Sequence, residues 1–210
     1  VRTLAMNSNP MCVAALPDGV HFVVGLGFGP NIGAVRLYHV DGTLVHTFEG
    51  HTNDVDALAV TPDGQHIISG SFDSLAKVWS VATKRLVSTC AGHSGWVRAV
   101  AAMPDGQRIL SGGDDRTVRV WLLNGTLENT FAMHFSFVIA LLALPDNQHA
   151  LSSAFDCTVK LFNVNDGTVL RTFHHTSYVY SLALLPDGLR FVSGSYDKTV
   201  RLVYHGLAPQ

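Results

Sequence analysis

The sequence predicts an all-β protein, a β-propeller of five four-stranded antiparallel blades. A turn of the type Pro-Asp-Gly or Pro-Asp-Asn recurs in steps of 45, 42, 41 and 41 residues, at Pro17, Pro62, Pro104, Pro145 and Pro186. Between the turns lie short runs rich in Val, Ile, Leu, Ala and Thr, which are typical of strands. Runs such as VAALP and FVVG barely alternate, so both faces of each sheet need cover, and a ring of stacked sheets provides it.

Each copy of the repeat contains four strands, which we call a, b, c and d. In the second copy the strands are VDALAVT, HIISG, AKVWS and RLVSTC, and the turns PDGQ, SFDSL and VATK separate them. The copies span approximately residues 8–51, 52–93, 94–134, 135–175 and 176–210, and residues 1–7 form a further strand. We expect residues 1–210 to form a single domain.

The two ends of the chain are complementary. The last copy supplies strands a, b and c but no strand d, whereas the chain opens with VRTLAMN, whose residue pattern resembles strand d of the other copies. Residues 1–7 are therefore expected to complete the last blade and close the ring, which would make the protein a monomer. The alternative is that the chain forms part of a longer propeller.

Composition and charge exclude several classes of function. Only 14% of the residues are charged and the formal net charge is −2, so we expect neither nucleic acid nor membrane as a partner. The three cysteines, Cys12, Cys90 and Cys157, form no C-x-x-C pair, which argues against a disulfide framework or a zinc site. We expect no metal and no cofactor, and an intracellular protein, cytoplasmic or nuclear.

The repeats resemble the WD-repeat β-propeller family over essentially the whole chain. The family pattern has Gly-His before strand a and Trp-Asp at the end of strand c. Gly50-His51 and Gly92-His93 match the first pair, and Trp79 and Trp121 hold the Trp place, although no Asp follows in any copy. The resemblance implies buried hydrogen-bonded sets: His51, Ser69, Asp73 and Trp79; His93, Ser111, Asp115 and Trp121; His134, Ser152 and Asp156; His175, Ser193 and Asp197. The first copy has Asn7 and Asn31 at the His and Asp places.

Asp, His and Ser also make up a hydrolase triad, so an enzyme is an alternative. A triad needs one exposed nucleophile, whereas this set recurs four times at the repeat period. A buried His that bridges Asp and Ser satisfies polar groups that would otherwise cost about 1–3 kcal/mol each. The prediction is a non-enzymatic scaffold, with a hydrolase or a structural fragment of a larger propeller as alternatives.

The partner is expected on the rim where the d–a and b–c connections emerge. Aromatic side chains stand where turns ordinarily prefer Gly, Asn, Asp or Ser, and aromatic anchors are enriched in binding hot spots. The blade-one connection GFGPNIG is four residues longer than its counterparts. The residues predicted to bind a protein or peptide are Phe72, Trp96, Phe137, Phe155, Tyr178 and Tyr196, with Phe28 and Asn31. Alternatively, the aromatic rings only pack over the turns as a lid.

Overall fold

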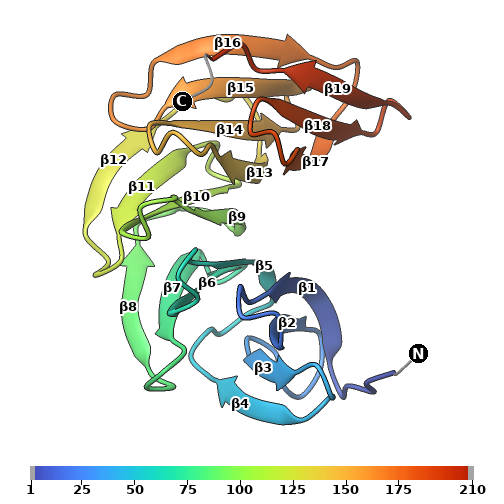
Figure 1. Cartoon of the computed structure of the whole chain (residues 1–210), viewed down its shortest axis with the longest axis vertical. Coiled ribbons are helices and arrows are strands. Elements are labelled where there is room, and N and C mark those ends of the chain that lie inside the picture. Colours follow the sequence, from blue (N-terminus) through green and yellow to red (C-terminus); the bar gives the residue numbers. More distant parts are fainter. Residues whose placement is uncertain (1–2, 208–210) are drawn as a thin grey trace.

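The fold is all-β, as predicted, with five antiparallel sheets that follow one another along the chain (Figure 1). The computed structural model describes residues 3–207. Among these residues no helix is long and apolar enough to cross a membrane. The strands, sheet by sheet, are β1 (Asn9–Ala15), β2 (His21–Gly27), β3 (Val35–His39) and β4 (Leu44–Phe48); β5 (Val55–Val60), β6 (His66–Ser71), β7 (Leu75–Ser80) and β8 (Leu86–Ala91); β9 (Val97–Ala102), β10 (Arg108–Gly113), β11 (Val118–Leu122) and β12 (Leu127–Phe131); β13 (Val138–Ala143), β14 (His149–Ala154), β15 (Thr158–Asn163) and β16 (Val169–His174); β17 (Val179–Leu184), β18 (Arg190–Ser195) and β19 (Val200–Tyr204).

The recurring Pro-Asp-Gly turn, which is Pro-Asp-Asn in the fourth sheet, joins the first two strands of each sheet. In the second sheet the Asp63 carboxylate accepts a hydrogen bond from the Gln65 backbone N–H at 2.9 Å. Gly64 takes a φ of +70°, which glycine adopts without steric cost. The Thr61 hydroxyl donates to the same carboxylate at 2.5 Å. This side-chain turn ends one strand and starts the next, so the turn residues fix the hairpin register.

The face of a sheet that is turned toward the next sheet in the chain is called its forward face, and each of the first four sheets packs this face against the next sheet. Three apolar side chains of the second and third strands form the centre of each forward face, and in the first four sheets they are at most 1% exposed. They are Val23, Val35 and Leu37; Ile68, Ala76 and Val78; Leu110, Val118 and Val120; Leu151, Val159 and Leu161. The core is thus a series of four interfaces between consecutive sheets.

The ring is open in this structure, so the expected closure by residues 1–7 is wrong for the residues it describes. The last sheet has three strands, in the order β17-β18-β19. Figure 1 shows this sheet and the first sheet at the two ends of an arc, with the N-terminal segment beside the first sheet. Residues 3–6 form no strand, and residues 1–2 lie outside the described part of the chain.

The N-terminal segment instead packs on the first sheet. Leu4 and Met6 lie against a cluster that contains Val24, Leu26 and Tyr38. Phe48 of β4 makes the corresponding contact with Trp79 of the second sheet, at 5.6 Å between ring centroids. The segment therefore lies where the outer strand of a preceding sheet would pack on the first sheet, but it forms no strand itself. An open arc fits the other alternative, a partial propeller.

Candidate functional site

The four predicted His, Ser and Asp sets come together in the second to fifth sheets. In the second sheet His51 Nδ1 lies 2.8 Å from Asp73 Oδ2, and His51 Nε2 lies 2.8 Å from Ser69 Oγ. Trp79 Nε1 donates to the same Ser69 hydroxyl at 2.8 Å. Because the Asp73 carboxylate can only accept, His51 Nδ1 donates to it, and Nε2 of the neutral imidazole accepts from the Ser69 hydroxyl, which in turn accepts from Trp79. The imidazole proton then lies on Nδ1 and faces Asp73.

The other three sheets repeat this geometry. In the third sheet the Nδ1 and Nε2 contacts of His93 measure 2.8 and 2.7 Å, and Trp121 donates to Ser111 at 2.8 Å. In the two sheets that lack the Trp, the Nδ1 distances are 2.8 Å for His134–Asp156 and 3.0 Å for His175–Asp197, and the Nε2 distances are 2.7 Å for His134–Ser152 and 2.8 Å for His175–Ser193. The first sheet has no such set, because Val24, Leu26, Ala34 and Tyr38 form an apolar cluster there.

Hydrogen bonding keeps the carboxylates of these sets charged. Burial by itself would raise the pKa of Asp73, but the hydrogen bond and charge interaction with His51 outweigh it, with help from the Thr52 N–H, and lower the pKa. The pKa of Asp115 is lowered in the same way, with His93 and Thr117 as partners. Each carboxylate therefore accepts hydrogen bonds from donors of the d–a connection and of its own b–c turn.

Burial separates these sets from a catalytic triad. The His51 side chain is 0% exposed and Ser69 is likewise 0% exposed, so no substrate carbonyl reaches the hydroxyl. The His93 and His134 side chains are also 0% exposed. Among residues 3–207, no three His, Cys, Asp or Glu side chains are grouped as metal ligands. The arrangement is suited to joining the d–a connection to the b–c turn of each blade.

Backbone hydrogen bonds bring six of the eight predicted partner-binding residues to one rim. In the second to fifth blades the N–H of the b–c residue donates to the carbonyl of the d–a residue, at 2.9–3.0 Å. The donor and acceptor pairs are Phe72 and Asp54, Asp114 and Trp96, Phe155 and Phe137, and Tyr196 and Tyr178. Eight positions that are far apart in sequence therefore line the same edge of four consecutive sheets.

The aromatic members of this rim contact one another across the sheets. Phe72 stacks on Trp96 with ring centroids 4.1 Å apart and an interplanar angle of 13°. Phe155 lies 6.1 Å from Phe137 and 4.6 Å from Tyr178. The side chains of Trp96, Tyr178 and Tyr196 are 42, 43 and 70% exposed. We call these six rings, together with Tyr180, the aromatic strip.

Arg98 of β9 bridges the strip where Asp114 interrupts its aromatic series. Its guanidinium lies 4.9 Å from the Trp96 ring centroid, 5.1 Å from Phe72 and 5.8 Å from Phe137. Arg98 also donates to both carboxylate oxygens of Asp114. The position two residues after Trp96 therefore supplies a cation that three rings surround.

A second carboxylate stands beside this arginine. Asp56 Oδ2 lies 3.8 Å from Arg98 Nη1. Burial raises the pKa of Asp56, and although the charge of Arg98 opposes the shift, the carboxylates of Asp114 and Asp54 add to it. Three carboxylates and one guanidinium make this end of the strip acidic.

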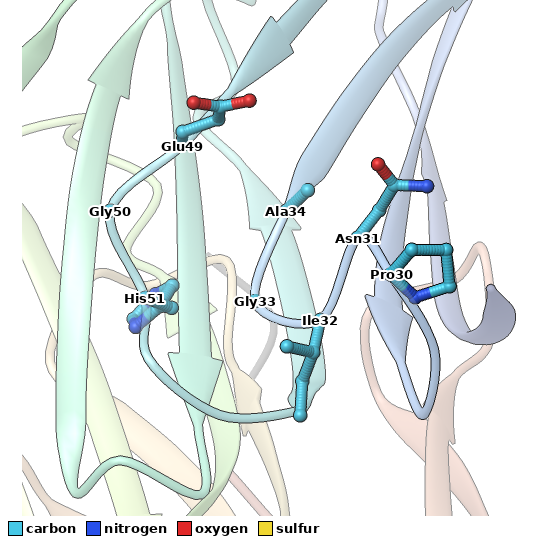
Figure 2. A pocket seen from close by; sticks show the side chains of 8 residues that line it. All are labelled: Pro30, Asn31, Ile32, Gly33, Ala34, Glu49, Gly50 and His51. Atoms are coloured by element: carbon cyan, nitrogen blue, oxygen red, sulfur yellow. The ribbon is translucent and has the colours of Figure 1, made fainter.

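The long connection of the first blade lies apart from these ring contacts. Figure 2 shows the segment from Pro30 to Ala34 opposite Glu49, Gly50 and His51, with a pocket between the two. Asn31 is half-buried and its N–H donates to Ser8 Oγ at 3.0 Å. Phe28 is 61% exposed, and its N–H donates to Asp54 at 3.1 Å. Phe28 joins none of the ring contacts formed within residues 3–207.

Sequence reasoning missed Tyr180, a member of the strip, and Arg98, which bridges it. Both occupy the second residue of their first strand, β9 and β17, two residues after a rim aromatic. Tyr180 lies 5.3 Å from Phe155 and 6.3 Å from Tyr196. The signal was available, because the repeat alignment places Asp56, Arg98, Ile139 and Tyr180 in one column, three of them polar or aromatic at the edge of a buried strand.

The sheets, the buried sets and the rim define a repeat protein of the β-propeller type. A family model described as "WD domain, G-beta repeat" matches residues 42–80, 84–121, 125–163 and 167–203, and the chain belongs to this WD40 family. Its propellers serve in general as non-enzymatic scaffolds for protein interactions. The predicted family and fold class are therefore confirmed.

This chain spans only part of the length of the relatives and of the solved structure that it matches. WD repeat-containing protein 18 is 30% identical over 73 residues in Danio rerio and 35% identical over 52 residues in Homo sapiens, which is 16% and 12% of those proteins. A "Ribosome biogenesis protein BOP1 homolog" of Drosophila grimshawi is 42% identical over 40 residues, or 5% of its length. The structure titled "Structure of U3-55K" aligns with 96% of this chain and 62% of its own, at 22% identity and a TM-score of 0.85, and shows the shared fold.

Proposed function

We propose that the aromatic strip is the surface on which this scaffold binds a protein or peptide partner. The observation that carries the proposal is the row of rings on four sheets, joined by ring contacts and by Arg98, in which Trp96, Tyr178 and Tyr196 keep 42–70% of their surface exposed. Large aromatic anchors with free area are the residues that dominate binding energy at interfaces. A lid would bury its rings, and these three rings remain open to solvent.

The rim is rigid where it carries the anchors. Each d–a connection is tied to its b–c turn by the backbone hydrogen bond described above and, beneath it, by a buried His–Asp pair. Binding then orders few groups that were mobile before, which preserves affinity. The buried sets are thus proposed to support the binding surface and to take no part in chemistry.

The test is to change Trp96, Phe137 and Tyr178 to Ser and to measure capture of partners from a cell lysate by the tagged chain. Hot-spot truncations cost about 2 kcal/mol or more each, so even partial additivity predicts a loss of affinity of about a hundredfold. The matched control changes Val45, Val87 and Leu170 to Ser, which are 39, 46 and 46% exposed on the outer strands β4, β8 and β16. Equal capture by both variants, with both folded, would contradict the proposal.

The relatives suggest a setting for this interaction. One group of relatives carries the name ribosome biogenesis protein. We propose that this chain works in the nucleus, within the intracellular location predicted from the cysteines. A fluorescent fusion that accumulates only in the cytoplasm would contradict this location, and it would leave the binding surface unaffected.

A further inference from the structure

Four rings at one end of the aromatic strip form a closed group, which we call the tyrosine cluster. Its members are Phe155, Tyr178, Tyr180 and Tyr196, from the fourth and fifth sheets. Around the group the ring centroids are separated by 4.6, 6.4, 6.3 and 5.3 Å, so each ring contacts two others. The three tyrosines are 43, 47 and 70% exposed. The cluster therefore presents several aromatic rings to solvent within a small area.

At the other end of the strip a cation lies among such rings, and the Asp114 carboxylate also holds it. Phe72, Trp96 and Phe137 surround the guanidinium of Arg98, with all three ring centroids within 5.8 Å of it. The negative face of an aromatic ring attracts a cation, and the attraction grows as the cation is desolvated. The same rim thus already holds one cationic side chain among three rings, and the chain itself supplies it.

Within residues 3–207 no cationic side chain lies over a ring of the tyrosine cluster. Arg98, Arg119 and Lys160 lie over rings within residues 3–207, but the rings are Phe72, Trp96, Phe137, Trp121 and Phe135. Ile139 stands in the fourth sheet where Arg98 stands in the third, so no basic side chain reaches toward the cluster from that position. Lys198 follows Tyr196 by two residues and lies over none of the rings in this part of the chain.

We propose that the tyrosine cluster binds a cationic side chain, arginine or lysine, of the partner. This inference rests on the proposed function and names the chemistry that the strip recognises. The charge at the other end of the strip agrees with it, since Asp54, Asp56 and Asp114 outnumber Arg98 there. Those carboxylates would repel the phosphates of a single-stranded RNA, which is the other ligand that exposed rings stack against.

The protein contains five tyrosines, so 3-fluorotyrosine labelling gives five ¹⁹F resonances. Three report on the cluster, whereas Tyr38, which is 7% exposed, and Tyr204 serve as internal controls. The probes are N-acetyl-arginine amide, N-acetyl-lysine amide and the neutral isostere N-acetyl-citrulline amide. We expect saturable shifts at Tyr178, Tyr180 and Tyr196 with the two cations, with a Kd of about 1–10 mM, and none with citrulline.

Two substitutions separate the ring from the hydroxyl. Tyr180→Phe keeps the ring and should change the Kd of the arginine probe by less than about twofold, whereas Tyr180→Leu should weaken binding by about fivefold or more. Tyr204→Leu is the matched control, because Tyr204 is 50% exposed and lies outside the cluster. Thermal melts check that each variant is folded.

Several results would overturn the inference. They are equal shifts with citrulline and arginine, equal shifts at all five tyrosines, no shift with either cation up to about 50 mM, or stronger binding of an oligouridine than of the cations. The proposed function has its own test, and it is contradicted when the substitutions of Trp96, Phe137 and Tyr178 leave partner capture unchanged. Capture that depends on those residues, without any cation binding, would leave the docking surface in place and remove only the cationic specificity.

Discussion

At the scale of single residues, the buried acceptors of the third sheet illustrate how much depends on one carboxylate. Asp115 accepts hydrogen bonds from His93 at 2.8 Å, from the Ser94 N–H at 3.2 Å and from the Thr117 hydroxyl at 2.8 Å. These donors belong to two connections that no other side chain of the set joins. The carboxylate thus fixes the d–a connection, which carries Trp96, to the b–c turn.

Replacement of Asp115 by Ala should leave the buried His93 Nδ1–H with only the Thr117 hydroxyl, 3.5 Å away, as an acceptor. We expect the free energy of unfolding to fall by about 2–4 kcal/mol, the range for breaking a buried polar network. Chemical denaturation measures it, and Asp166→Ala, at an exposed turn, should cost less than about 1 kcal/mol. Equal losses for the two variants would show that the buried set does not stabilise the blade.

The same carboxylates predict a dependence of stability on pH. The pKa values of Asp73, Asp115 and Asp156 are lowered in the folded protein, so below the ordinary value of about 3.9 the unfolded chain takes up protons first. This contribution to stability is therefore complete at neutral pH and decreases as the pH falls below about 5. Denaturation at pH 7 and pH 4 should show the decline, and the cost of Asp115→Ala should be smaller at pH 4. A cost that does not change with pH would contradict the assignment.

At the scale of strands and sheets, close packing between blades depends on small residues in the second strand of each sheet. A Cβ added at Gly112 of β10 would lie 2.6 Å from Val138 Cγ1 of the next sheet. Gly25 and Gly70 make equivalent approaches to Val55 and Val97. These glycines allow the first strand of one blade to approach the second strand of the preceding blade.

Gly112→Ala should therefore separate two sheets and lower stability by about 1–3 kcal/mol. Gly194 of β18 occupies the same place in the last sheet, where an added Cβ would meet only Ser181 Oγ, which can rotate away. Gly194→Ala should accordingly cost less than about 1 kcal/mol. Denaturation midpoints compare the two, and a larger loss for Gly194→Ala would contradict this account of blade packing.

The elements of this fold follow closely from local sequence, whereas their closure does not. The turn at Asp63 and the His51 set are encoded by residues at fixed offsets within one repeat, so their pattern predicts them. Whether β19 meets residues 1–7 depends on the angles between sheets at four successive interfaces. These angles add up over the arc, and no short sequence motif encodes their sum. The pattern of aromatic turn residues does not predict Arg98 and Tyr180, because both lie within a first strand, at a position whose side chains reach the same rim.

At the scale of the whole molecule, the last sheet leaves its forward face uncovered. Val200 and Leu202 of β19 are 75 and 59% exposed, whereas their counterparts Val159 and Leu161 in the fourth sheet are both 0% exposed. β19 is also the edge strand of its three-stranded sheet, and no fourth strand formed by residues 3–207 lies beside it. An apolar face next to an unpaired strand edge is a surface that favours association between molecules.

We therefore expect the chain to self-associate through this face, and the change of Val200 and Leu202 to Lys to suppress the association without loss of stability. The charges would stand in solvent and repel a second copy, whereas Lys at Val159 and Leu161 would bury two unpaired charges and unfold the protein. Sedimentation velocity at increasing concentration measures the first effect and thermal melting the second. A chain that remains monomeric at about 100 µM, a concentration at which association worth more than about 5.5 kcal/mol would be detected, would show that this face does not drive association. Self-association that survives both lysines would place the contact on another part of the surface.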